Sequence, residues 1–170
     1  DYPLEWDDVV AQSSPGATIG RPHIADALVA RGHSPNRSAA FATILRSKSG
    51  YYRPHYAPDP IVAVRLIRLA GGVPVLAHPA TSSRAWAVSN GALERFVDAG
   101  LAGVEIGHRE NSTTGKIQLR ELAHRYDLII TGSSDYHGTG KSNRLGENTT
   151  DAESLDRIVA DATGTSPIYA

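Results

Sequence analysis

The sequence predicts an α/β fold in which a helical region precedes alternating helices and short strands. Three observations support this prediction. After Pro60, helical and strand-like apolar segments follow one another in the βαβαβα rhythm of a parallel sheet. The first third of the chain carries only helical patterns and loops. Polar residues suited to an active site follow the predicted strands, at the edge where parallel sheets and α/β barrels carry their sites.

The first third is predicted to contain three short helices. Residues 4–18 read as an amphipathic helix followed by a turn at Pro15 and Gly16. The segment GRPHIADALVARG forms the next helix, with Pro22 near its start and Gly32 at its end. A further helix over about residues 36–47 leads into the aromatic loop YYRPHYAPDP.

The remaining two thirds are predicted to alternate. We expect strands over residues 73–77, 104–106 and 128–131. We expect helices over residues 61–70, 92–99, 116–126 and 152–162. In this pattern, His78, the stretch from Glu105 to His108, and the pair Asp135 and His137 all fall at the carboxyl ends of strands.

Composition limits the classes of function. A chain of 170 residues, 41% hydrophobic and 21% charged, fits a globular fold with a sizeable core. A formal charge of -1 argues against binding long nucleic acid over a broad basic surface, but leaves small anionic substrates open. The absence of cysteine leaves His, Asp and Glu as metal ligands. Because the sequence has no secretory signal and no apolar span, we expect a cytoplasmic protein that does not enter a membrane.

The run TGSSDYHG is the most informative segment of the chain. In an extended segment residues i and i+2 point to the same side, so Asp135 and His137 can face one site together. His78, in GGVPVLAHPA, ends another strand and offers a third ligand. The alternatives are an Asp-capped turn at Asp135 and a His78 that is bonded to backbone. An Asp-capped turn does not account for His137 equally well.

Three segments carry a family resemblance: AHP, GLAGVEIGHRE and YDLIITGSSDYHGTGK resemble the second half of a PHP (polymerase and histidinol phosphatase) domain. GRPHIADALVARG and the Tyr-rich loop resemble the helical insertion of PHP phosphoesterases that act on nucleoside monophosphates, nucleotide bisphosphates and short RNA 5' ends. The resemblance implies a distorted seven-stranded β/α barrel with up to three divalent metals. It also implies that His78, Asp135 and His137 are metal ligands.

One departure from the family pattern is large. The opening HxHTxxSDG motif, and the Glu and His ligands that follow it, have no counterpart in this sequence. We therefore expect residues 1–58 to be the helical insertion and residues 59–170 to be the C-terminal half of a partial PHP-like barrel. The N-terminal half would come in cis or from another chain. Because a metal site needs about four to six ligands per ion, we expect this fragment alone to be a poor enzyme.

Glu105 and the residues after it have several interpretations. Glu105 is expected to hold a ligating histidine or to pair structurally, rather than to bind metal directly. His108 and Arg109 suit phosphate binding, with a solvated loop as the alternative. Lys141 and Arg144 lie in GTGKSNRLGEN, which suits a phosphate-contacting loop but lacks the GxxxxGKS spacing.

In the predicted insertion, Arg21 and His23 lie at a helix N-terminus, where anions are favoured. We assign both to substrate phosphate, with helix capping or packing as the alternative for His23. The Tyr-rich loop suits base stacking or packing between subdomains.

The resemblance implies metal-assisted hydrolysis of a phosphate ester, in which bound divalent ions lower the pKa of a water and polarise the phosphoryl oxygens. Mixed His and carboxylate ligation favours Mn²⁺, Zn²⁺ or Fe²⁺. We assign no side chain a catalytic role beyond holding metal or substrate. The alternative function is a non-catalytic nucleotide- or phosphate-binding module with a degenerate metal site.

Overall fold

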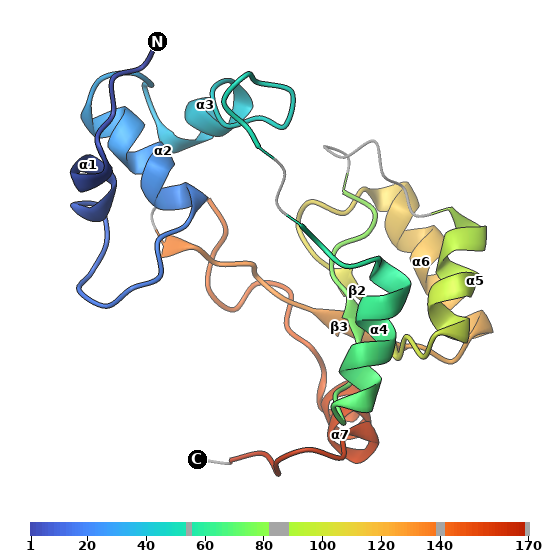
Figure 1. Cartoon of the computed structure of the whole chain (residues 1–170). Coiled ribbons are helices and arrows are strands. Elements are labelled where there is room, and N and C mark those ends of the chain that lie inside the picture. Colours follow the sequence, from blue (N-terminus) through green and yellow to red (C-terminus); the bar gives the residue numbers. More distant parts are fainter. Residues whose placement is uncertain (54–55, 82–88, 139–141, 169–170) are drawn as a thin grey trace. The chain divides into compact units, whose positions relative to one another are not determined.

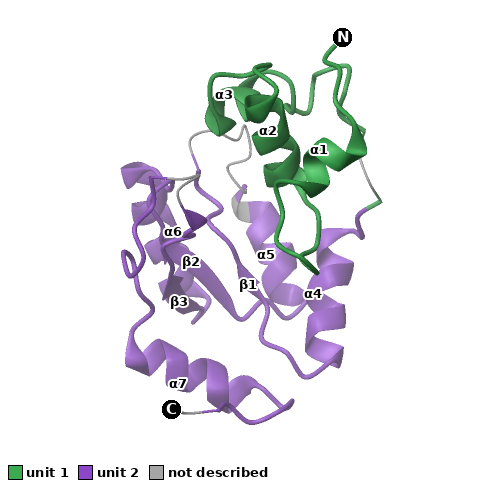
Figure 2. Cartoon of the chain, turned by 90° about the vertical axis from the view of Figure 1, so that its left-hand side faces the viewer, with its two compact units in different colours: residues 1–56 green, residues 57–170 purple. Residues whose placement is uncertain are grey.

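The computed structural model describes residues 1–53, 56–81, 89–138 and 142–168. It divides into two compact units, residues 1–56 and residues 57–170 (Figure 1; Figure 2). The boundary between these units lies close to the one expected after residue 58. The assignment of the units as an insertion and a half-barrel stays a prediction.

The first unit is built from three short helices, α1 (Trp6–Val10), α2 (Arg21–Ala30) and α3 (Arg37–Ala42). The helix α2 packs against both α1 and α3. Ion pairs tie the helices together at their surface, and one joins Arg31 to Asp8 at 2.6 Å. The Arg31 guanidinium lowers the pKa of Asp8 below its ordinary value. The small core of this unit comprises Ala25, Leu28, Ala40 and Ile44.

Two of these helices are shorter than the sequence predicts, because hydroxyl side chains bond back to the helix. After α1, the amide and the hydroxyl of Ser13 both donate to the carbonyl of Val10, at 3.0 and 2.9 Å. After α3, the hydroxyl of Thr43 donates to the carbonyl of Ala39 at 2.7 Å. Such bonds offer the backbone a local alternative to continuing the helix.

The second unit alternates helices with a parallel sheet, as predicted. Its three strands pair in the order β1-β2-β3. Each helix and strand overlaps a predicted segment. The elements are α4 (Pro60–Leu69), β1 (Val75–Leu76), α5 (Asn90–Asp98), β2 (Gly103–Gly107), α6 (Thr113–Arg125), β3 (Ile129–Gly132) and α7 (Ala152–Asp161).

The central strand β2 separates an apolar face from a polar one. Val104 and Ile106 are 0% and 1% exposed and belong to the core cluster. That cluster also includes Leu93 from α5 and Leu119 from α6. Because side chains alternate along a strand, Glu105 between Val104 and Ile106 turns to the other face of the sheet. The helices therefore fix β2, and β2 presents Glu105 away from the core.

The strand β1 is shorter than predicted, with two residues instead of five. Pro74 precedes it and has no N–H to donate to the ladder, although its carbonyl accepts the amide of Ala102 at 2.9 Å. After the strand, His78 adopts a left-handed backbone with φ of 31°. This backbone turns the chain out of the extended conformation where the candidate site begins.

The sequence predicted no membrane-spanning segment. In the part of the chain that the structure describes, no helix combines the length and the apolar character needed to cross a bilayer.

We predict that Leu93→Ala destabilises the second unit by about 2–5 kcal/mol, because it leaves a cavity in a closely packed core. Leu93 is 1% exposed, whereas Leu69 is 84% exposed. Leu69→Ala is the matched control and should change stability by less than about 0.5 kcal/mol. Urea denaturation followed by circular dichroism measures both. Equal effects of the two substitutions would contradict the assignment of the core.

Candidate metal centre

The predicted site residues of the second unit come from the segments that follow its three parallel strands. His78 lies two residues after β1, and His108 directly follows β2. Asp135 and His137 follow β3, and Asp135 also has a left-handed backbone, with φ of 47°. Because parallel strands end at the same edge of a sheet, these segments meet there.

Glu105 links all three strand ends. One of its carboxylate oxygens accepts the backbone N–H of His78 at 2.9 Å, and the other accepts the hydroxyl of Ser133 at 2.7 Å. Glu105 itself is 8% exposed, so these bonds lie in an environment of low polarity, where they are stronger than in water. The carboxylate therefore holds the loop after β1 against the loop after β3.

Asn111 provides a second link between the loops. Its amide nitrogen donates to the carbonyls of Glu105 and Ile106, at 3.0 and 3.2 Å. Its amide oxygen accepts the backbone N–H of Ala80 at 3.0 Å. Asn111 is 4% exposed, and its three bonds connect the segment after His78 to the end of β2.

His108 is fully buried and stands between His78 and Asp135. The rings of His78 and His108 have centroids 4.6 Å apart. Nε2 of His108 lies 3.6 Å from Oδ2 of Asp135. The buried position excludes the solvated-loop alternative for His108. Three residues form a candidate metal-binding group, because each offers one ligand atom and these atoms lie within 4.8 Å of one another: His78, Glu105 and His108.

Asp135 and His137 approach each other as their spacing predicted. Nε2 of His137 lies 2.9 Å from Oδ1 of Asp135. This is a hydrogen-bond distance, and it is also about the spacing of two ligands of one ion whose bonds of about 2.1 Å meet at right angles. The side chain of His137 is 54% exposed and that of Asp135 is 26% exposed, which leaves the pair open to solvent on one side.

The donor set fits a divalent cation. Among the described residues, Nδ1 of His78 is buried without a hydrogen-bond partner. An unpartnered buried nitrogen is rare and calls for an explanation, and an ion is one of the usual ones. Imidazole and carboxylate groups together suit Mn²⁺, Fe²⁺ and Zn²⁺. The predicted ligands His78, Asp135 and His137 would hold such an ion, with Glu105 beside them.

The predicted phosphate-binding residues after β2 and β3 have different surroundings. Arg109 donates to Ser142 at 2.7 Å and to Glu147 at 3.0 Å, so its charge is already paired. The side chain of Arg144 is 86% exposed and its Nε lies 3.9 Å from Glu147, which leaves most of its donors available. Lys141 lies outside the described residues.

Arg21 and His23 make structural contacts within the first unit. The guanidinium of Arg21 donates to the carbonyl of Leu45 and lies over the rings of Phe41 and Tyr52, at 5.1 and 5.5 Å from their centroids. Nδ1 of His23 accepts the backbone N–H of Gly20 at 3.0 Å, which is the capping alternative considered for it. Their contact with substrate phosphate stays a prediction.

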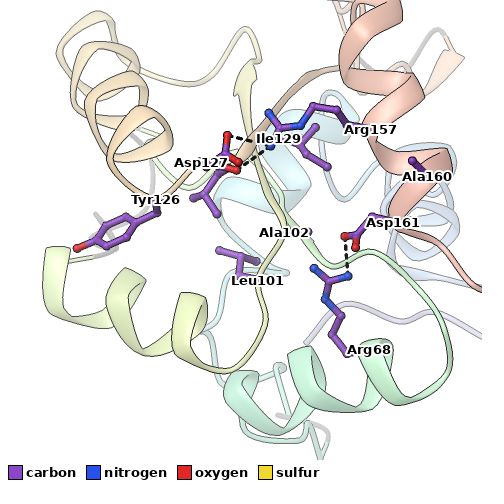
Figure 3. Close-up of a pocket in the computed structure, with 10 residues that line it drawn as sticks. Arg68, Leu101, Ala102, Tyr126, Asp127, Ile129, Arg157, Ala160 and Asp161 are labelled. Atoms are coloured by element: carbon purple, nitrogen blue, oxygen red, sulfur yellow. Dashed lines mark hydrogen bonds and ion pairs between the residues drawn. The ribbon is translucent and has the colours of Figure 1, made fainter.

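One cavity of about 470 Å³ lies away from these residues, at the amino ends of the strands (Figure 3). Ala102, immediately before β2, and Ile129, at the start of β3, line it. Its two arginines are engaged, because Arg68 pairs with Asp161 at 2.6 Å and Arg157 pairs with Asp127 at 3.1 Å. Because this cavity lies at the amino ends of the strands and the candidate metal centre at their carboxyl ends, the two sites are separate.

Two polar residues that organise the site could not be recognised from the sequence. Asn111 follows β2 in a stretch that reads as an ordinary loop. The amide of Asn143 donates to the carbonyl of Ser134 at 2.7 Å and is 6% exposed, although the sequence suggested only a phosphate-contacting loop there. Burial of a lone Asn depends on tertiary contacts that no local pattern records.

Comparison with known proteins identifies relatives of one chemical class. The chain is 39% identical over 108 residues to a phosphoribosyl 1,2-cyclic phosphate 1,2-diphosphodiesterase of Eggerthella lenta, a match covering 61% of this chain and 39% of that protein. It is 28% identical over 136 residues to the 5'-3' exoribonuclease Rnm of Salmonella typhimurium, covering 79% of this chain and 46% of that protein. No family model matches the chain.

Two solved structures resemble the chain over most of its length. A candidate metal-dependent phosphoesterase from Bifidobacterium adolescentis superposes with a TM-score of 0.90 at 43% identity, covering 96% of this chain and 58% of that one. An amidohydrolase from Chromobacterium violaceum, solved with sulfate and no metal, gives 0.66 at 26% identity, covering 92% and 57%. The expected resemblance to PHP-type phosphoesterases is confirmed. The chain spans less than half of these curated relatives.

We predict that Glu105→Gln retains metal affinity within about tenfold, whereas Glu105→Ala weakens it by about 10- to 100-fold. A glutamine oxygen can accept the His78 N–H while its amide donates to Ser133, so the link between the loops survives without the charge. Isothermal titration with Zn²⁺ measures both variants. If Gln weakens binding as much as Ala, Glu105 is a direct ligand.

Proposed function

We propose that this chain is part of a divalent-metal-dependent phosphoesterase that hydrolyses phosphate monoesters of nucleotides. The substrate would be a nucleoside monophosphate, a 3',5'-bisphosphate or the 5' end of a short RNA. One observation carries the proposal: imidazole and carboxylate groups from three parallel strand ends converge, with Asp135 and His137 2.9 Å apart and His108 beside Asp135. The chemical class of the relatives supports it.

The proposal includes a partial barrel. Residues 57–170 would be the C-terminal half of a distorted (β/α)7 barrel, and residues 1–56 would be a helical insertion. The high structural similarity to a candidate phosphoesterase that extends beyond the matched part supports this view. The remaining metal ligands would come from the other half in cis or from another chain, and this chain alone would then have little activity.

The side chains of this chain would hold metal ions and orient the substrate. His78, Asp135 and His137 would hold Mn²⁺, Zn²⁺ or Fe²⁺, up to three ions in the complete site, and Glu105 would fix the loops that carry them. A bound divalent cation would supply Lewis-acid polarisation of the phosphoryl group. Of Arg109 and Arg144, the second is the better candidate to bind substrate phosphate, because its guanidinium is exposed and only weakly paired.

The names of the relatives guide the choice of substrates. One relative is named for a cyclic phosphate diester and another for RNA degraded from its 5' end. Both substrates contain a ribose phosphate. A test of nucleotide monoesters should therefore include a 5'-phosphorylated oligoribonucleotide and a cyclic phosphate for comparison.

We predict that the chain binds Mn²⁺ or Zn²⁺ and that Asp135→Asn weakens binding at least about tenfold, since it removes the charge of a ligand. Elemental analysis after dialysis gives the metal content, and phosphate release from the substrates above gives the activity. His124→Ala, which removes an exposed histidine of α6, is the control and should bind as the parent does. Normal binding by Asp135→Asn would refute the assignment of this site. If the chain binds nucleotides but no metal, the result would favour the alternative of a non-catalytic binding module.

We predict that Arg144→Ala weakens the binding of a nucleoside 5'-monophosphate by about tenfold. The loss of one charged hydrogen bond costs about 1.5 kcal/mol. Arg120→Ala removes an exposed arginine of α6 and is the matched control. Calorimetric titration of the metal-loaded chain compares the two variants. An unchanged affinity in Arg144→Ala would remove this residue from the substrate site.

A further inference from the structure

The two nitrogens of His108 have different partners. Nδ1 accepts the backbone N–H of Glu110 at 3.2 Å. A nitrogen that accepts a hydrogen bond carries a lone pair and no hydrogen, so in a neutral imidazole the hydrogen must lie on Nε2. The backbone after β2 therefore fixes the tautomer of His108 before any ion binds. His108 itself is fully buried.

The hydrogen on Nε2 faces a carboxylate. Nε2 lies 3.6 Å from Oδ2 of Asp135, and it has no hydrogen-bond partner among the described residues. The distance is a few tenths of an ångström longer than that of a formed N–H···O bond. Closing it would require the two groups to approach by a few tenths of an ångström. The other oxygen of Asp135, Oδ1, is the one that lies beside His137.

Direct ligation by His108 conflicts with this network. A cation on Nε2 needs the lone pair there, which moves the hydrogen to Nδ1. Nδ1–H would then face the N–H of Glu110 at 3.2 Å, and two donors would oppose each other in a partly buried position. His108 belongs to the candidate group with His78 and Glu105 only because its ligand atom is close to theirs. Its tautomer leaves Nε2 without the lone pair that a metal ligand needs.

We propose that His108 is a positioning residue, which donates Nε2–H to Oδ2 of Asp135 and so directs Oδ1, with His137, towards the cation. This inference rests on the proposed function of the site, and it assigns His108 neither to the metal nor to substrate phosphate. Second partners of this kind fix the orientation of a ligating carboxylate and commonly change metal affinity by 10- to 100-fold.

The first test observes the tautomer itself. Nitrogen-15 NMR of the histidine-labelled chain, with His108 assigned by comparison with a variant that lacks it, reports which ring nitrogen carries hydrogen. We expect Nε2–H in the metal-free chain and after saturation with Zn²⁺, while His137 becomes metal-bound. An Nδ1–H tautomer of His108, free or with zinc, would overturn the inference. If zinc changes no histidine signal, the metal centre itself fails, and the metal-free tautomer still decides whether His108 donates to Asp135.

The second test separates positioning from ligation and from packing. His108→Gln keeps an N–H donor near the Nε2 position, so zinc affinity should stay within about threefold, whereas His108→Leu should lose about 10- to 100-fold. In an Asp135→Ala background, His108→Leu should cost nothing further, because its effect passes through that carboxylate. His124→Leu is the control. Equal losses in Gln and Leu, or an undiminished loss in the Asp135→Ala background, would overturn the proposal.

Discussion

The candidate site depends on the carboxylate of Glu105. Its two oxygens bond to the loop after β1 through His78 and to the loop after β3 through Ser133. A single side chain can do this only from the middle strand, and β2 is the middle strand of the described sheet. Hydrogen bonds to a charged group contribute about 1.5–3 kcal/mol each, so the pair outweighs an ordinary loop contact. The apolar partners of Val104 and Ile106 fix the strand, and the strand in turn fixes the carboxylate.

These bonds hold backbone that would otherwise relax. His78 and Asp135 are not glycines, yet both have positive φ, at 31° and 47°. Such conformations cost on the order of 1–3 kcal/mol and persist only where neighbouring bonds hold them. Glu105 holds His78 through its N–H, and Asn143 holds Ser134, next to Asp135, through its carbonyl. The residues predicted to bind metal are thus placed by residues with no assigned part in binding it.

The sequence predicted the alternation after Pro60 and the strand-end positions of His78, Asp135 and His137, because periodicity and spacing are local properties. It did not predict that His108 is buried. The pairing of β2 with β3 shifts between Glu105 and Gly107, and such an irregularity redirects the side chains that follow it. The sequence also did not predict the close contact between α6 and the AHP segment. A Cβ on Gly115 would lie 2.4 Å from that of Ala80, so the glycine allows this contact.

The proposed half-barrel would lack metal ligands because it lacks strands. Each described strand brings one polar segment to the shared edge, so a fuller ligand set requires further strands beside β1 or β3. The strand β1 is only two residues long and follows a proline. Both features limit nonspecific pairing of another strand at its edge, which is how natural sheets protect exposed strands. A strand that paired there would need to match a short register, Val75 and Leu76 alone. Completion of the metal centre would then be tied to correct completion of the sheet.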